Sequence, residues 1–129
     1  MYLKINKVKI PIEIKTNFKD KIKSFRLKLS EIDSGLCFVK KRRINTYFYY
    51  QRVDIIATDK NNKILTIFKD APTERRYKGK KGTYFLYVFP VGVANFYDID
   101  DILNVTLNSD DKKLLEVFKN KKKQWFDVL

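Results

Sequence analysis

Short β-prone runs, separated by turn residues every eight to twelve residues or so, constrain the fold of this chain more than any other feature. The runs alternate apolar with polar residues and are rich in the β-branched and aromatic side chains that strands favour. They lie at 2–14, 35–40, 44–51, 53–58, 64–69, 83–89 and 101–107. This spacing predicts a mainly β sandwich or barrel and argues against a series of parallel βαβ units.

Two helices are expected among the strands. Apolar residues recur at helical spacing through 17–29, and Asn17 has the chemistry of an N-cap. A second helix is expected to begin at Ser109 as its cap, with Asp110 and Asp111 in the first turn. Lysines cluster at its end, where they either complement the helix dipole or form a basic surface for phosphates.

The chain of 129 residues has the length of one domain. We expect residues 1–107 to form the β-barrel or sandwich and 108–129 to form a basic helix packed on it or extending from it. No apolar run approaches the ~20 residues of a membrane span, and no signal peptide is evident. The lone Cys37 lies between two apolar residues and is expected to be a buried, reduced thiol. These features together predict a cytoplasmic protein.

The charge is strongly positive. Lysine and arginine number 28 against 15 acidic residues, a net charge of +13. Such an excess predicts a polyanionic partner, either nucleic acid or an anionic membrane surface. The alternative is compositional drift, because lysine far outnumbers arginine and the chain is rich in Ile, Asn, Tyr and Phe. Composition leaves both explanations open.

The stretch "INTYFYYQ" (44–51) is expected to be one long strand. Alternation would then place Ile44, Thr46, Phe48 and Tyr50 on one face and Asn45, Tyr47, Tyr49 and Gln51 on the other. A hairpin loop is expected at 59–63, where Asn tolerates the left-handed conformation, and a loop at 70–82. The tyrosines form either a base-stacking surface or simply the two sides of a core strand.

Several segments resemble a widespread prokaryotic family, the domain of unknown function 192. "NTYFYYQRVDIIATDKNNKI" (45–64) matches the family's central stretch at Thr46, Phe48, Asp54, Asp59 and Lys60. "SGLCFVK" (34–40) matches an upstream strand at Gly35 and Phe38. "YFLYVFPVGVANFYDIDDIL" (84–103) matches a downstream segment at Leu86, Pro90, Gly92, Ile99 and Asp101.

The resemblance covers residues 8–106, roughly, and the C-terminal helix is an addition to it. It implies a compact, mainly β fold of the jelly-roll-like barrel or sandwich type. The chain departs from the family pattern at several polar positions: Asn45, Tyr49, Arg52, Tyr87 and Asp100. The family has no established activity, so the resemblance implies a fold and no function.

The sequence offers little catalytic chemistry. It contains no histidine, which excludes His-based triads and imidazole metal ligands. It has no phosphate-binding or dinucleotide-binding glycine motif, and we predict no metal and no cofactor. The weak catalytic candidates are Asp54 and Asp101, which would act as an acid/base pair if they converged. The alternative for Asp54 is a strand-end carboxylate that accepts backbone N–H bonds or pairs with a cation.

We therefore expect a small binding module rather than an enzyme, with a polyanionic or small polar partner bound on a basic, tyrosine-rich face. The candidate binding residues are Lys40, Lys41, Arg42, Arg43, Tyr47, Tyr49, Arg75 and Arg76. One alternative is an enzyme with a carboxylate site near Asp54 and Asp101. Another is a protein–protein adaptor that docks a partner through Trp125 and Phe126 of the C-terminal helix.

Overall fold

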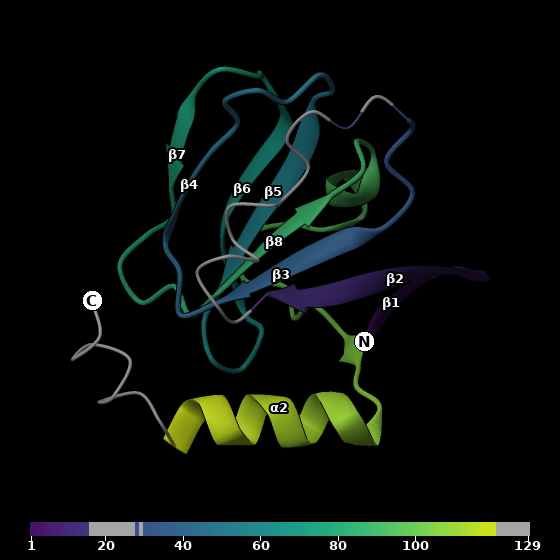
Figure 1. Ribbon diagram of the computed structural model, residues 1–129, viewed down its shortest axis with the longest axis vertical. Helices are drawn as coiled ribbons and strands as arrows, with labels where there is room; N and C mark the ends of the chain where they lie inside the picture. The colour runs from purple at the N-terminus through teal and green to yellow at the C-terminus, as the bar shows by residue number, and fades with distance from the viewer. Residues whose placement is uncertain (16–27, 29, 121–129) are drawn as a thin grey trace.

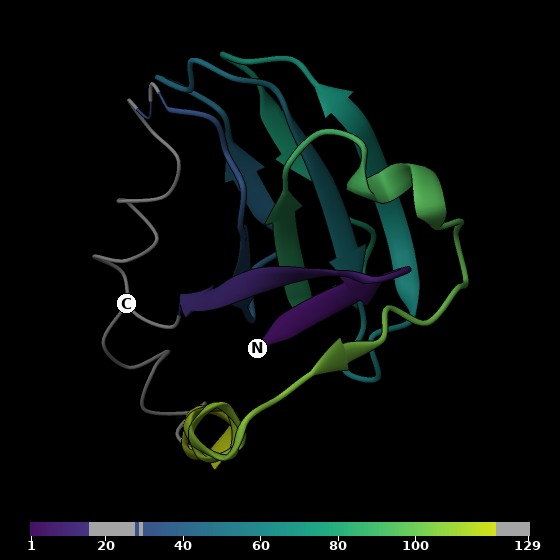
Figure 2. The same ribbon diagram turned by 90° about the vertical axis from the view of Figure 1, so that its right-hand side faces the viewer.

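The protein is a curled seven-stranded sheet that forms a half-barrel, with a separate two-stranded ribbon beside it and one helix near the C-terminus (Figures 1 and 2). A computed structural model describes residues 1–15, 28 and 30–120, and the side chains of that part up to residue 116. The strands of the large sheet are β1 (Tyr2–Ile5), β2 (Val8–Lys15), β3 (Gly35–Val39), β5 (Val53–Thr58), β6 (Ile64–Ala71), β8 (Phe85–Phe89) and β9 (Val105–Thr106). The mainly β class predicted from the strand spacing is confirmed.

The large sheet has the order β6-β5-β8-β3-β2-β1-β9. Its neighbours are antiparallel except β2 and β3, which run parallel and pair from Ile12 opposite Gly35 to Lys15 opposite Phe38. The strand spacing did not predict this parallel pair. A parallel connection needs a crossover of a dozen or more residues. The helix expected at 17–29 falls within that crossover and, apart from residue 28, lies outside the described residues.

The three central strands β3, β5 and β8 are buried on both faces. Alternation along them therefore divides the core into two clusters. The first cluster contains Phe85, Tyr87 and Phe89 of β8, and the second contains Leu86 and Val88 of the same strand. Every residue of β8 thus contributes to one side of the core or the other, which makes this strand the centre of the fold.

The ribbon consists of β4 (Arg43–Asn45) and β7 (Arg76–Lys78), paired antiparallel. Ile44 lies opposite Tyr77. Both pack against the second core cluster, and the Tyr77 ring lies 5.1 Å from that of Phe68. The ribbon therefore covers the second cluster's side of the sheet and turns its other face outward.

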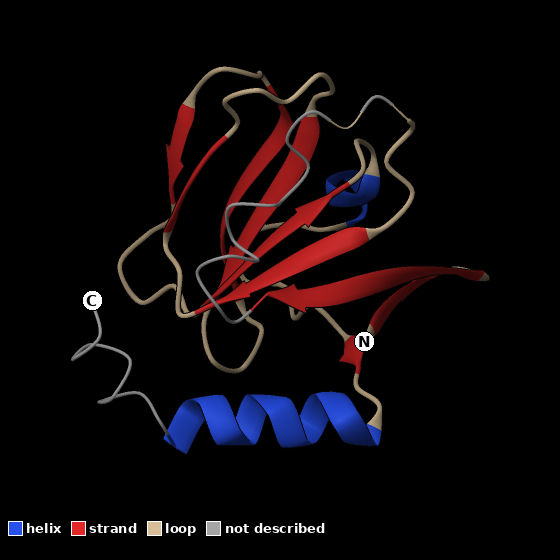
Figure 3. Ribbon diagram, in the orientation of Figure 1, coloured by secondary structure: helices blue, strands red, loops and turns tan. Residues whose placement is uncertain are grey.

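The first cluster is covered by different elements. The 3-10 helix η1 (Val93–Phe96) places Val93 and Ala94 in it. The helix α2 (Ser109–Asn120) is the long blue helix below the sheet in Figure 3, and its Leu115 packs against the same cluster. The first turn of α2 is tied to the sheet by an ion pair between Asp111 and the α-amino group of Met1.

Several local predictions were wrong at their boundaries. The strand expected at 44–51 ends at Asn45, and residues 47 and 48 form a turn. The loop expected at 70–82 contains β7. The cap of α2 is Asn108, whose Oδ1 accepts the Asp111 N–H at 2.8 Å, and not Ser109. The run at 2–14 forms two strands, β1 and β2, which separate at the turn after Ile5.

The early end of β4 has a long-range cause. Thr46 is 1% exposed and binds the segment that leads into β7. Its N–H donates to the Arg75 carbonyl at 2.8 Å, and its hydroxyl donates to the Pro72 carbonyl at 2.9 Å. Its own carbonyl accepts N–H bonds from Glu74 and Tyr49. These bonds close a turn where the local β propensity favoured a continued strand.

We predict that Cys37 is chemically inert in the native protein. The side chain is 0% exposed, and burial raises the pKa of its thiol far above its ordinary value. The reactive thiolate is therefore scarce at neutral and mildly alkaline pH. Ellman's reagent should react with the native protein only at the rate of unfolding, and rapidly in urea. Fast stoichiometric reaction without denaturant would contradict this burial.

Candidate functional site

The Asp54 carboxylate lies at the start of β5 and is 1% exposed. Its Oδ1 accepts the Asp70 N–H at 2.8 Å, and its Oδ2 accepts the Gly92 and Ala94 N–H groups, each at 2.9 Å. A buried carboxylate is tolerated only where such bonds replace its hydration. We call this arrangement the Asp54 clamp. It joins β5, the end of β6 and the turn before η1.

Gly92 gives the clamp its geometry. Its φ is 109°, in the left-handed region that side chains disfavour. In this conformation the Gly92 and Ala94 N–H groups both donate to the same oxygen of the Asp54 carboxylate, Oδ2. Asp70, on the other side of the clamp, also has a positive φ of 49° at a register shift between β5 and β6. Two of the three partners of Asp54, Gly92 and Asp70, are thus irregular backbone positions held by the carboxylate.

The structure does not bring Asp54 and Asp101 together. The Asp101 carbonyl accepts the Ile64 N–H, and Ile64 pairs with Thr58 at the far end of β5. Thr58 lies four positions beyond Asp54 along the strand, a distance of ~13 Å. The Asp101 carboxylate accepts the Asp98 N–H at 2.8 Å within its own turn. Each carboxylate has a structural role, and the two lie at opposite ends of β5.

The basic run at 40–43 begins with three residues that contact the body of the protein. Lys40 has a positive φ of 54° and is half-buried. The Lys41 Nζ lies 5.4 Å from the centroid of the Phe38 ring. The Arg42 Nε donates to the Gly79 carbonyl at 2.7 Å, which links the start of β4 to the end of β7. Arg42 therefore helps to close the ribbon.

The next residues form the outer face of the ribbon, defined as Arg43, Asn45, Arg76 and Lys78. Arg43 lies opposite Lys78, and Asn45 lies opposite Arg76, on the side away from Ile44 and Tyr77. Arg43, Arg76 and Lys78 are exposed. The Arg76 guanidinium lies 6.0 Å from the centroid of the Tyr47 ring. Within the described residues, none of these three cations forms an ion pair with a carboxylate.

The aromatic residues beside this face differ from those the sequence pattern singled out. Tyr49 is 3% exposed and belongs to the second core cluster, so it offers no stacking surface. Phe48 and Tyr50 are instead 62% and 60% exposed. The exchange follows from the turn after Asn45, which ends the strand alternation. Only Tyr47, among the two predicted tyrosines, remains beside the ribbon.

Phe48 also has unusual backbone geometry. Its φ is 65°, a left-handed conformation that is strained for a bulky residue. The conformation is held by the Phe48 N–H, which donates to the Glu74 Oε1 at 2.8 Å. Strain of this kind is often found at functional positions. The sequence carries no signal for this turn. A run of aromatic residues without a typical turn residue favours a strand instead.

In the part of the chain that the structure describes, no group of three or more Cys, Asp or Glu residues is arranged to hold a metal ion. The same residues include no helix with the length and apolarity needed to cross a bilayer. Trp125 and Phe126, named for the adaptor alternative, lie outside the described residues.

We predict that Asp54→Asn lowers the free energy of unfolding by about 3 kcal/mol, because the new NH₂ group meets backbone donors and leaves buried N–H groups unpaired. Asp98→Asn is the matched control, since Asp98 is exposed, and should change stability by less than ~0.5 kcal/mol. Urea denaturation measures both. Equal stability of the two variants would show that the Asp54 clamp contributes nothing.

No family model matches the chain, and no curated protein matches it. Two solved structures are similar to it in fold. One is a candidate transcription regulator from Sinorhizobium meliloti 1021, with a TM-score of 0.67 and 13% identity, covering 80% of this chain and 89% of that chain. The other is a protein of unknown function from Novosphingobium aromaticivorans, with a TM-score of 0.61 and 12% identity, covering 74% of each chain. At these identities the likeness concerns the fold alone.

Proposed function

We propose that the protein binds single-stranded nucleic acid on the outer face of the ribbon, with the exposed aromatics of the adjoining turn as stacking surfaces. The observation that carries the proposal is the meeting of two basic runs. Residues 40–43 and 75–78 are about thirty positions apart in the sequence, yet they pair in one ribbon that exposes Arg43, Arg76 and Lys78. Backbone phosphates are the anions that such a row of cations suits.

The electrostatics of the ribbon support the same partner. Segments 40–52 and 69–82 hold eleven basic residues and two acidic ones. Of the two, Asp70 pairs with Arg52 at 3.4 Å and Glu74 binds the Phe48 N–H. Like charges directly opposite each other, as Arg43 and Lys78 are, destabilise a strand pair. A bound phosphate would relieve that repulsion.

The aromatic turn supports a single strand over a duplex. An exposed, conformationally restrained ring beside arginines can stack on any base, because every base has a π-face. Phe48 has this combination of exposure and fixed backbone. Bases of a duplex are already stacked, so the ring would have no comparable role there.

We also propose that the chain is a divergent member of the domain of unknown function 192. The supporting point is the Asp54 clamp. Asp54 and Gly92 belong to two separate segments that resemble the family, and the Gly92 N–H donates to the Asp54 carboxylate. A structural bond between two matched positions explains why both residue types would recur together.

We predict that removing the paired cations weakens binding and its salt dependence. Each phosphate contact with a single strand contributes about −0.7 to the slope of log K against log salt. The double variant Arg43→Ala/Lys78→Ala should therefore lower the magnitude of the slope by about 1.4. Fluorescence anisotropy with a labelled oligothymidylate of about 15 nucleotides, between ~50 and ~200 mM salt, measures it.

A matched control is built into the chain. Lys4 and Lys9 are a second exposed pair of like charges directly opposite each other, on β1 and β2. Lys4→Ala/Lys9→Ala changes the net charge equally but leaves the ribbon intact. If both double variants lower the magnitude of the slope of log K against log salt by the same amount, binding reflects overall charge and the ribbon proposal is wrong. Tighter binding to a duplex of the same length would contradict the choice of a single strand.

We predict that Phe48→Asn separates stacking from folding. Asparagine tolerates the left-handed conformation, so stability should stay equal or rise, while loss of one stacked base should weaken oligothymidylate binding about tenfold at an unchanged salt slope. The control is Phe96→Asn, which replaces an equally exposed Phe (59%) in η1. Unchanged affinity of Phe48→Asn would remove the aromatic turn from the proposal.

A further inference from the structure

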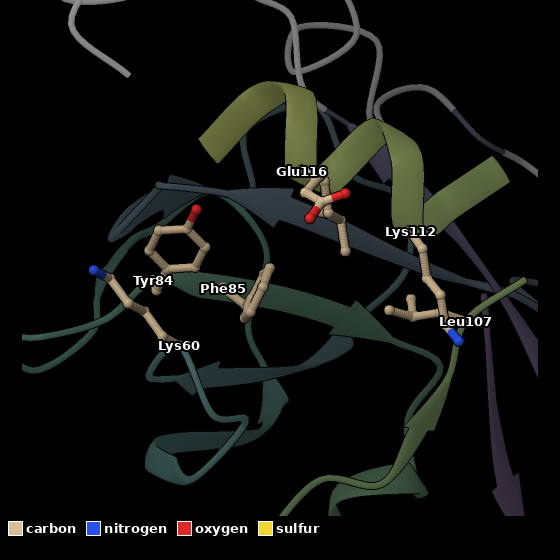
Figure 4. Close-up of a pocket in the computed structure, with 7 residues that line it drawn as sticks. Lys60, Tyr84, Phe85, Leu107, Lys112 and Glu116 are labelled. Carbon is tan, nitrogen blue, oxygen red and sulfur yellow. The ribbon is translucent and has the colours of Figure 1, made fainter. Parts of the chain in front are cut away.

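A cavity of about 400 Å³ lies between α2 and the end of the half-barrel (Figure 4). Its lining residues are Lys60, Tyr84, Phe85, Leu107, Lys112, Leu115 and Glu116. We propose that this cavity is a binding site for a small amphipathic anion, an aromatic or short aliphatic carboxylate. Its volume lies within the usual range of sites for small organic ligands. The inference is independent of nucleic-acid binding.

The floor of the cavity is aromatic and aliphatic. Phe85 begins a row of rings along β8, with its centroid 6.0 Å from Tyr87, which stacks on Phe89 at 5.7 Å. Tyr84 meets Phe85 edge-on, with ring centroids 4.7 Å apart and an interplanar angle of 85°. Aromatic pairs favour such edge contacts, and a ligand ring or alkyl chain can extend the row. The apolar part of the ligand is thereby specified.

The aliphatic wall comes from two further elements. Leu107 lies between β9 and α2, and Leu115 projects from α2 onto the first core cluster. Figure 4 shows the Phe85 ring beneath the helix and the Leu107 side chain beside Lys112. A ligand in this space would touch the sheet and the helix at once, so its burial would add directly to the packing of α2.

The rim carries the charge that selects an anion. Lys60 and Lys112 are exposed, and neither pairs with a carboxylate among the described residues. The Lys60 Nζ lies 5.7 Å from the centroid of the Tyr84 ring. Glu116 is the single acidic group of the lining, so the two lysines leave the rim with a positive excess. Coulomb attraction therefore favours a carboxylate over a neutral or cationic head group.

Tyr84 also lines the cavity and adds a phenol hydroxyl to it. Burial raises the pKa of this phenol, and a protonated phenol hydroxyl can donate a hydrogen bond. The site thus combines apolar walls, two cations and one hydroxyl donor. That combination matches an organic anion better than inorganic phosphate, which has no apolar part to bury.

The test uses the full chain and three probes with one hydrophobic group: phenylbutyrate, phenylbutanol and phenylbutylamine. Binding is followed by NMR of methyl-labelled leucines, with Leu107 and Leu115 as reporters. We expect phenylbutyrate to shift both methyl signals and to bind more tightly than the alcohol, with the amine weakest. No shift of either reporter with phenylbutyrate, or equal affinity for all three probes, would overturn the proposal.

Two charge-reversal variants of α2, at residues 112 and 113, test the role of the lysine at the rim. Lys112→Glu should weaken phenylbutyrate binding roughly threefold to fivefold and leave phenylbutanol unchanged. Lys113→Glu carries the same charge change on the same helix, and residue 113 does not line the cavity. Equal effects of the two variants would overturn the site, since the charge effect would then be general. The Leu107 and Leu115 signals could also shift with protein concentration in the absence of any probe. That result would mean that a second copy of the chain occupies the cavity, and it would overturn the small-anion proposal.

Discussion

A single buried carboxylate holds the irregular parts of this half-barrel in place. Asp54 accepts N–H groups from Asp70, Gly92 and Ala94, all within 2.9 Å. Without it, three donors at the end of β6 and at the entry to η1 would be buried without partners, each at a cost of about 1–3 kcal/mol. The clamp therefore holds the backbone at the register shift between β5 and β6 and at the start of η1, which covers the first core cluster. The acidic residue among aliphatics thus serves the fold, and Asp101 does not lie beside it as an acid/base partner.

The central strand β8 separates the two proposed sites. Its odd-numbered side chains, Phe85, Tyr87 and Phe89, belong to the first cluster, and the cavity under α2 opens at Phe85. Its even-numbered side chains belong to the second cluster, which the ribbon covers through Ile44 and Tyr77. The proposed nucleic-acid face and the proposed small-anion cavity thus lie on opposite sides of one sheet. Substitutions in one site can be made without touching the other, which keeps their tests independent.

The stretch after Ile44 does not follow its local β propensity. Its β-branched and aromatic residues favour a strand, and alternation assigned Phe48 and Tyr50 to the same face as Ile44. The chain turns instead, because Thr46 bonds to Pro72, Glu74 and Arg75 from a segment almost thirty residues later. Those bonds bury Tyr49 and expose Phe48 at a positive φ. No signal within the stretch itself could have predicted them.

Other features follow from residues close in sequence and were predictable. The hairpin at 59–63 was predicted from its asparagines, and Asn62 has a φ of 62° there. The short strands, the buried thiol and the excess of positive charge are likewise properties of composition and period. The sequence alone determined the mainly β class and excluded histidine chemistry. Only the tertiary structure decided that the two basic runs meet, that Asp54 and Asp101 stay apart, and that a cavity forms beneath α2. The physical reason is that periodicity specifies which face of a strand is apolar, whereas strand pairing and long-range hydrogen bonds decide which faces come together.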